Sequence, residues 1–331
     1  MLEVLASGLL DTVQDGGRPG ARDLGVPVSG ACDAWSLAVA DRLLGNEPDA
    51  AALEITALGP TLAVRQTCVL ALAGAELGAS VPEEGRALPV GTSQLVHAGT
   101  RIVFAGPRGG RGLRTYLALA GGIDVPLVLG SRSTCLAGSF GGLDGGPLQT
   151  GDVLRPLRPD DLTAAGRRWP GGGFDPTARR ALRLLPGPST LSAACPGAYE
   201  ALVATAWRVS GSADRMGLRL AGPPLAVDAA AAGMLVSRGV LPGTVQILPD
   251  GSPLVLLADA QTVGGYPVAG IVPAADLPLL GQLRPGDPLR FRAATAAMAR
   301  AASRRQARGF AALRSRLERG TSWDLLADAA G

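Results

Sequence analysis

Short apolar runs, each cut by glycine or proline, dominate the hydrophobic pattern of the chain. The runs at 67–75 and 115–122 are rich in Val, Leu and Ala, and those at 244–259 and 288–293 repeat the pattern. Runs of this length, bounded by turn residues, are typical of strands. The Pro-Asp-Gly sequence at 249–251 predicts a hairpin turn. We therefore expect a mainly β chain with a few helices, because many short strands favour a barrel or a sandwich.

Helical spacing is confined to a few segments. The segment 34–46 follows Asp33, a favourable N-cap residue, and carries Gly45 at its end. A second, shorter helix is expected at 196–207. These two segments interrupt an otherwise strand-like pattern.

The pattern Val-Ser-Gly-x-x-Asp occurs twice, at 28–33 and at 209–214. Two further pairs of similar segments follow in the same order: 59–64 with 222–227, and 148–156 with 283–291. Three pairs in one order indicate that the chain contains two versions of one unit.

This duplication predicts the domain organisation. The first unit spans 1–157, a linker rich in Gly, Pro and charge spans 158–180, and the second unit spans 181–293. The tail at 294–331 carries Ala, Leu and Arg at helical spacing, with Gly320 as a stop signal. We expect it to form one or two amphipathic helices against the second unit.

The repeated motif has two interpretations. In the first copy Asp33 caps a helix, whereas Asp214 is followed by a segment in which no long helix fits. Capping therefore explains one copy only. Either the motif marks turns and caps, or Ser29 with Asp33 and Ser210 with Asp214 line equivalent pockets.

Composition and charge exclude several functions. The chain has 331 residues and a net charge of +3, without the basic stripe typical of nucleic-acid binding. No apolar run reaches the ~18 residues that span a bilayer, and the N-terminus lacks the features of a signal peptide, so we expect a cytoplasmic protein without membrane contact.

All 31 residues of the Lys+Arg count are arginine, so no lysine carries biotin or serves a phosphate loop. One histidine, His97, and four cysteines without a C-x-x-C pair predict no metal site.

Four stretches carry more polar and glycine residues than folding requires: 11–20, 106–114, 212–217 and 259–267. The arginine-rich loop at 106–114 suits a carboxylate or another anion. The polar groups of 259–267 follow a buried-looking strand beside a double glycine, which suits the floor of a pocket. Both features also have purely structural explanations. The arginine-rich loop can be the tip of a hairpin, and neighbouring Asp and Arg side chains can be solvated ion pairs.

Five long motifs in these regions resemble the biotin-dependent carboxyltransferase family, also called the allophanate hydrolase subunit 2-like family. They are GLLDTVQDGGRPGARDLGVPVSGACD, LEITALGPTL, RTYLALAGGIDVPLVLGSRST, SGSADRMGLRLAGPPL and PGTVQILPDGSPLVLLADAQTVGGYP. The resemblance covers about residues 4–293. It implies duplicated cyclophilin-like β-barrel domains, followed here by a C-terminal helical tail.

The resemblance and the polar stretches together give the candidate site residues. The candidate catalytic residues are Asp259, Gln261, Tyr266, Asp214, Arg215 and Gln246. The candidate substrate-binding residues are Gln14, Asp15, Arg18, Ser29, Asp33, Arg114, Thr262, Gly264 and Gly265. In this interpretation arginines stabilise developing charge and Asp259 positions water.

The family implies that the chain is the C subunit of an ATP-dependent 5-oxoprolinase, which opens 5-oxoproline to glutamate. It implies two partner chains, a subunit-1-like B subunit and a third A subunit, with ATP bound by the complex. We expect the isolated chain to be inactive. Two alternatives stay open: half of a carboxyltransferase for urea-like substrates, which needs a separate biotinyl carrier, and a regulatory binding protein of the KipA type.

Overall fold

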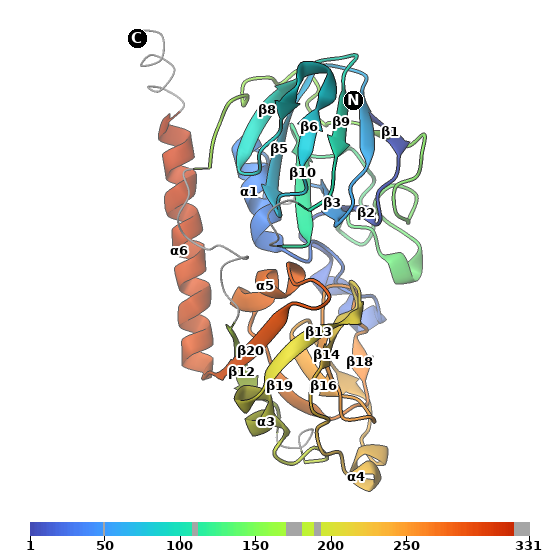
Figure 1. Cartoon of the computed structure of the whole chain (residues 1–331), viewed down its shortest axis with the longest axis vertical. Coiled ribbons are helices and arrows are strands. Elements are labelled where there is room, and N and C mark those ends of the chain that lie inside the picture. The colour runs from blue at the N-terminus through green and yellow to red at the C-terminus, as the bar shows by residue number, and fades with distance from the viewer. Residues whose placement is uncertain (49, 108–111, 170–180, 189–192, 321–331) are drawn as a thin grey trace.

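Two β-rich halves stack end to end in the computed structural model, and one long helix runs alongside both of them (Figure 1). The structure describes residues 1–48, 50–107, 112–169, 181–188 and 193–320. Its mainly β character and its few helices confirm the expected fold class.

The N-terminal half contains two open sheets. The six-stranded sheet has the order β11 (Val153–Leu154), β1 (Leu2–Ala6), β4 (Thr61–Val64), β9 (Arg101–Phe104), β6 (Ala79–Val81) and β7 (Arg86–Ala87). The five-stranded sheet has the order β2 (Asp11–Gln14), β3 (Ala52–Thr56), β10 (Arg114–Leu119), β5 (Cys68–Gly74) and β8 (Thr92–Val96). Short 3-10 helices lie at η1 (Pro19–Leu24), η2 (Pro82–Glu84) and η3 (Leu136–Gly138).

The five-stranded sheet is covered on both faces. On strand β5, Leu70 and Leu72 pack into the core shared with the six-stranded sheet, while Ala71 and Ala73 pack against helix α1 (Ala34–Leu44). Side chains alternate between the faces of a strand, so an apolar run without polar interruptions is what a doubly covered strand requires. The small alanines on one face allow the helix to approach closely.

The C-terminal half contains a closed barrel. Its strands follow the order β12 (Ala181–Pro186), β19 (Val268–Ile271), β16 (Thr244–Ile247), β17 (Pro253–Leu256), β14 (Gly217–Ala221), β13 (Ala206–Ala213) and β20 (Pro288–Ala293). The expected hairpin joins β16 to β17, with Gly251 in the left-handed region at φ 79°. Trp207 lies in the barrel core, and its indole nitrogen donates to the Leu202 carbonyl at 3.1 Å.

Smaller elements complete this half. A two-stranded ribbon pairs β15 (Arg238–Gly239) with β18 (Val263–Gly264). The helical segments are α3 (Ala198–Ala204), α4 (Ala229–Gly233), η4 (Ala274–Asp276) and α5 (Leu277–Gly281). Helix α3 lies within the helix expected at 196–207.

The expectation of two β-barrels is correct for the second half only. In the first half the described strands form two open sheets rather than a closed barrel. The sheets bury their facing surfaces against each other, and α1 buries the remaining face of the five-stranded sheet. Layered packing of this kind hides the apolar faces without closing a sheet on itself. The domain boundaries drawn from the repeat stay a prediction.

The repeated motif takes a different structure in each copy. Asp33 caps α1 as expected, because its Oδ1 accepts the Ser36 N–H at 2.9 Å, and Gly45 ends the helix at φ 66°. Exposed Asp214 accepts the N–H groups of Met216 and Gly217, at 2.8 and 3.0 Å, in the turn between β13 and β14. Both copies therefore use an aspartate to organise local backbone, but the first is buried and the second is exposed, so they do not line equivalent pockets.

The tail forms helix α6 (Ala296–Gly320), as its spacing predicts. Phe310 of α6 packs against Trp35 of α1 at a ring separation of 5.2 Å, and Trp169 joins the same aromatic cluster. The helix thus contacts the first half as well as the second. The expected second helix at 321–331 and the linker residues 170–180 lie outside the described residues. None of the helices in the described part of the chain combines the length and apolar character needed to cross a membrane.

Candidate functional site

A buried network of charged side chains joins the two halves. Arg215, in the turn before β14, is 2% exposed. Its Nε and Nη2 donate to the two oxygens of Asp259 at 2.7 and 3.2 Å, and Nη2 also donates to the Gly30 carbonyl at 2.7 Å. Its Nη1 forms an ion pair with Glu54 of β3. Every nitrogen of this guanidinium is therefore used, and it bonds to both halves at once.

Glu54 is the centre of the network on the N-terminal side. Its Oε2 accepts the Tyr116 hydroxyl at 2.6 Å and the Cys32 N–H at 2.9 Å. Its Oε1 lies 3.3 Å from the Arg114 Nε, and Arg114 also donates to the Gly281 carbonyl at 2.5 Å. A single carboxylate thus faces two guanidinium groups and two neutral donors.

Gln282 extends the network from the C-terminal half. Its amide nitrogen donates to Asp33 Oδ2 at 2.7 Å and to the Arg114 carbonyl at 2.9 Å. Its amide oxygen accepts the N–H groups of Leu113 and Arg114 at 2.9 and 3.0 Å. These bonds tie the end of α5 to the start of β10 and to the cap of α1.

The electrostatics of this network follow from burial and pairing. Burial alone would raise the pKa of Glu54, but the charges of Arg215 and Arg114, with the Tyr116 hydroxyl, hold it below its usual value. Asp33 has no such cation, so burial raises its pKa despite the hydrogen bonds from Ser36 and Gln282. Two guanidinium groups therefore balance two carboxylates, Glu54 and Asp259.

Four of the candidate residues meet in this network: Asp33, Arg114, Arg215 and Asp259. Glu54, Tyr116 and Gln282 were not among the candidates. A signal for Glu54 exists in the sequence, because it is one acid inside the apolar run Leu-Glu-Ile-Thr. A charge within a strand that is buried on both faces must be paired.

A second group of candidates fixes a loop of the N-terminal half. Asp15 accepts the hydroxyls of Ser131 and Ser133, at 2.6 and 2.5 Å, and the Arg132 N–H at 2.5 Å. Arg18 donates to the Ser133 carbonyl, and its guanidinium lies 5.1 Å from the centre of the Phe140 ring. Gln14 donates to the Thr134 carbonyl at 3.3 Å. These contacts explain why the three polar side chains are buried. Their substrate-binding role stays a prediction.

Six further candidates lie around the ribbon at one end of the barrel. Gln261 donates to Gln246 at 3.4 Å, and a Cβ at Gly264 would lie 2.5 Å from the Gln246 amide nitrogen. The Thr262 carbonyl accepts from Arg22 at 3.4 Å. These residues and Gly265 surround β18, whereas the Tyr266 side chain is exposed. The predicted catalytic roles of Gln261, Tyr266 and Gln246 are left untested by these contacts.

Of the anion-binding loop predicted at 106–114, residues 108–111 lie outside the described residues. Arg114 is buried in the network rather than presented to solvent. Within the described residues, no group of three or more His, Cys, Asp or Glu side chains is placed to hold a metal ion.

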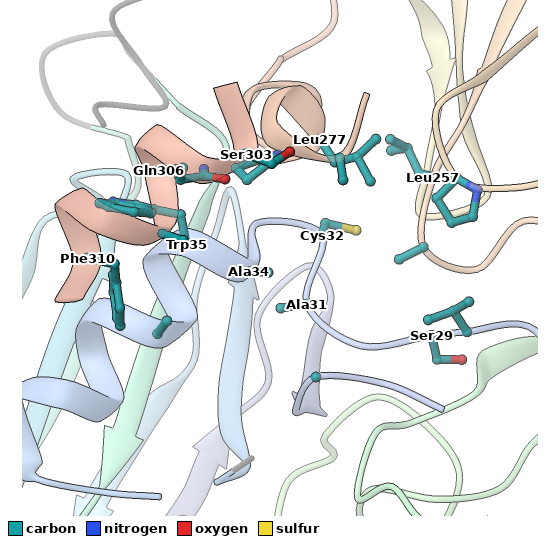
Figure 2. Close-up of a pocket in the computed structure, with 18 of the residues that line it drawn as sticks. Ser29, Ala31, Cys32, Ala34, Trp35, Leu257, Leu277, Ser303, Gln306 and Phe310 are labelled. Carbon is teal, nitrogen blue, oxygen red and sulfur yellow. The ribbon is translucent and has the colours of Figure 1, made fainter. Parts of the chain in front are cut away.

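A cavity of about 640 Å³ lies beside the network, between α1, the barrel loops and α6 (Figure 2). Its walls are largely apolar and include Trp35, Leu257, Leu277 and Phe310, and Ser29 is the candidate residue on its surface. Cys32 also lines it, and the Cys32 sulfur is 3.4 Å from the Arg215 Nη1. The network therefore stands directly behind one wall of this cavity.

Comparison with known proteins agrees with the sequence motifs. Residues 24–293 match the family described as carboxyltransferase domain, subdomains A and B. The chain therefore belongs to this family, as the resemblance indicated.

Relatives of two kinds are similar to the chain. It is 38% identical to the C subunit of the 5-oxoprolinase of Escherichia coli over 294 residues, covering 88% of this chain and 90% of the relative. It is 32% identical to urea amidolyase of Lachancea kluyveri, but spans only 17% of that protein. A crystal structure of TTHA0988 matches with a TM-score of 0.74 at 40% identity, over 88% of this chain and 55% of that chain.

The bridging hydroxyl of Tyr116 gives a first prediction. Tyr116→Phe removes the donor to Glu54 and the acceptor of the Asp33 N–H, which is 2.7 Å away. Because both partners stay buried, we expect a loss of about 1–3 kcal/mol in the free energy of unfolding, measured by urea titration. The control is Tyr199→Phe, which removes one bond to the Leu184 carbonyl and should cost less. Equal losses at the two positions would contradict a bridging role.

Proposed function

We propose that the chain is the C subunit of an ATP-dependent 5-oxoprolinase that opens the lactam of 5-oxoproline to glutamate. The observation that carries the proposal is the nearly end-to-end match to the C subunit of the Escherichia coli 5-oxoprolinase, which covers 90% of that relative. The match to urea amidolyase covers 17% of a much longer chain.

The cavity between the halves is the proposed substrate site. Concave, largely apolar pockets at domain interfaces are where small molecules usually bind. Hydrolysis of a lactam develops negative charge on its carbonyl oxygen, and donors in a water-poor pocket stabilise such charge strongly. The Ser29 hydroxyl is buried and has no hydrogen-bond partner among the described residues, so it is the first donor to consider.

We assign Arg215 and Asp259 to positioning this site. Both carboxylate oxygens of Asp259 accept from Arg215, so this ion pair fixes the orientation of the carboxylate. Asp259 directly follows Leu257 and Ala258, which line the cavity. The ion pair therefore holds that wall against Cys32 and Gly30 of the first half.

The partners and the cofactor follow from the same proposal. The chain has no lysine for a phosphate loop or for biotin, so we place ATP at a partner chain or at an interface between chains. The A and B subunits complete the enzyme, and we expect the complex in the cytoplasm.

A second candidate is half of a carboxyltransferase for a urea-like acceptor. The family match over residues 24–293 and the similarity to urea amidolyase support it. This function needs a biotinyl carrier on another chain. Dependence on carboxybiotin rather than on ATP alone distinguishes it from the first proposal.

The decisive test measures glutamate release and ATP hydrolysis with 5-oxoproline in a mixture of the A and B subunits, with and without this chain. We expect activity only in the complete mixture, and none from the chain alone. If an assembled complex releases no glutamate, the 5-oxoprolinase proposal is wrong, and carboxyl transfer from carboxybiotin to urea-like acceptors becomes the next assay.

A further inference from the structure

The cavity between the halves has an unbalanced charge. Among the residues that line it, Arg42 of α1 carries a full charge, and no Asp or Glu side chain lines it. No carboxylate in the described part of the chain forms an ion pair with Arg42. The cavity therefore presents one cation without an ion-pair partner in the described part of the chain.

The neighbouring acid does not supply the missing charge. Asp41 is buried and accepts from the Asn46 amide at 3.0 Å. Burial raises the pKa of Asp41 to about 8, against smaller lowering effects of Asn46 and Arg42. At neutral pH this carboxyl is mostly protonated, so the charge of Arg42 is not neutralised by it.

Helix α6 fixes the position of Arg42. Its guanidinium carbon lies 5.7 Å from the centre of the Phe310 ring, a cation–π contact that does not use the guanidinium N–H groups. Phe310 itself is held against Trp35 and Trp169. The cation is therefore held in place by an aromatic cluster rather than by an acid.

The rest of the cavity is apolar, with a hydroxyl at the far end. Figure 2 shows Phe310 and Trp35 at one end, and Ser29 with Leu257 at the other. Because Arg42 contacts Phe310, the cation and the Ser29 hydroxyl lie toward opposite ends. A ligand with one anionic end and an uncharged body complements this arrangement.

We propose that this cavity binds a small organic monocarboxylate, and that Arg42 binds its carboxylate group. A carboxylate on Arg42 directs the body of the acid along the apolar wall toward Ser29. Planar, charge-assisted pairing between guanidinium and carboxylate supplies both affinity and orientation. The identity of the acid as 5-oxoproline rests on the proposed function, whereas the binding of a monocarboxylate does not.

Isothermal titration of the full chain tests this assignment. The probes are 5-oxoproline, its analogue 2-pyrrolidinone without the carboxylate, and cyclohexanecarboxylate with cyclohexanemethanol as a second matched pair. We expect the wild type to prefer each acid over its neutral partner. Arg42→Gln should weaken binding of the acids about tenfold or more and leave the neutral compounds unchanged. Arg42→Lys should fall between the two, because lysine keeps the charge and loses the planar fork.

Arg101→Gln is the matched control, since Arg101 pairs with Glu83 on an exposed surface far from the cavity lining. It should bind the acids like the wild type. Equal binding of the acids by the wild type and Arg42→Gln overturns the assignment, and so does a wild type that binds neither of the two acids. If cyclohexanecarboxylate binds through Arg42 but 5-oxoproline does not, the carboxylate site stands and its assignment to 5-oxoproline fails.

Discussion

Replacement of Arg215 by methionine is expected to lower the free energy of unfolding by about 3–5 kcal/mol. Methionine fills much of the space of the arginine stem but leaves Glu54 and Asp259 without their cation. Glu54 and Asp259 are 1% and 3% exposed, so water cannot replace the lost partner without opening the interface. Arg114 compensates Glu54 only in part, because its Nε lies 3.3 Å away and it belongs to the same half.

Urea unfolding of the full chain measures this effect. The control is Arg219→Met on the neighbouring strand, where the ion pair with Asp250 leaves side chains 39% and 54% exposed. An exposed pair contributes about 0–1 kcal/mol, so this variant should unfold close to the wild type. Similar losses for the two variants would show that Arg215 is not held by a buried network.

Replacement of Asp41 by asparagine is expected to stabilise the protein much more at pH 8 than at pH 5. Burial raises the pKa of Asp41 from 3.8 to about 8. Between these values the native state keeps a proton that the unfolded chain releases, so stability falls as pH rises from about 4 to about 8. At ~1.36 kcal/mol per unit, the cost at pH 8 has an upper limit of ~5 kcal/mol.

Asparagine removes this proton linkage without changing the shape of the side chain. Its amide oxygen can still accept from Asn46, as Asp41 Oδ1 does at 3.0 Å. The position of Oδ2, which has no hydrogen-bond partner among the described residues, is taken by an amide nitrogen. Unfolding temperatures measured from pH 5 to pH 8 should diverge between the two proteins as pH rises. Parallel profiles would contradict a neutral Asp41, and Asp124→Asn at an exposed position is the control.

Local structure could be predicted from the sequence where short-range physics decides it. Asp33 and Gly45 bound α1 as their capping chemistry requires, and the Pro-Asp-Gly turn joins two strands. The closure of the sheets could not be predicted this way. The apolar run at 68–74 has the same sequence pattern whether its strand lies in a barrel or in an open sheet that is covered on both faces. The pattern depends on which side chains are buried and not on what covers them.

Only part of the buried network could be predicted from the sequence, because its pairings join residues that are far apart in the chain. Asp33, Arg114, Arg215 and Asp259 stood out as polar residues in glycine-rich motifs, but nothing local indicates that Arg215 pairs with Glu54, 161 residues away. Arg42 could not be predicted as a site residue, because one arginine near the end of an amphipathic helix is common. The proposed role of Arg42 depends on the absence of acidic side chains from the cavity lining, and only the folded structure shows which residues form that lining.

The ion pair of Arg215 with Glu54, which joins the halves, also influences how the molecule unfolds. Opening the interface would leave Arg215 with one carboxylate in its own half and Glu54 with one cation in the other. Each half then loses one partner of the buried network, so opening the interface costs both halves together. We therefore expect the two halves to unfold together as one cooperative unit, in which damage to the core of either half weakens both.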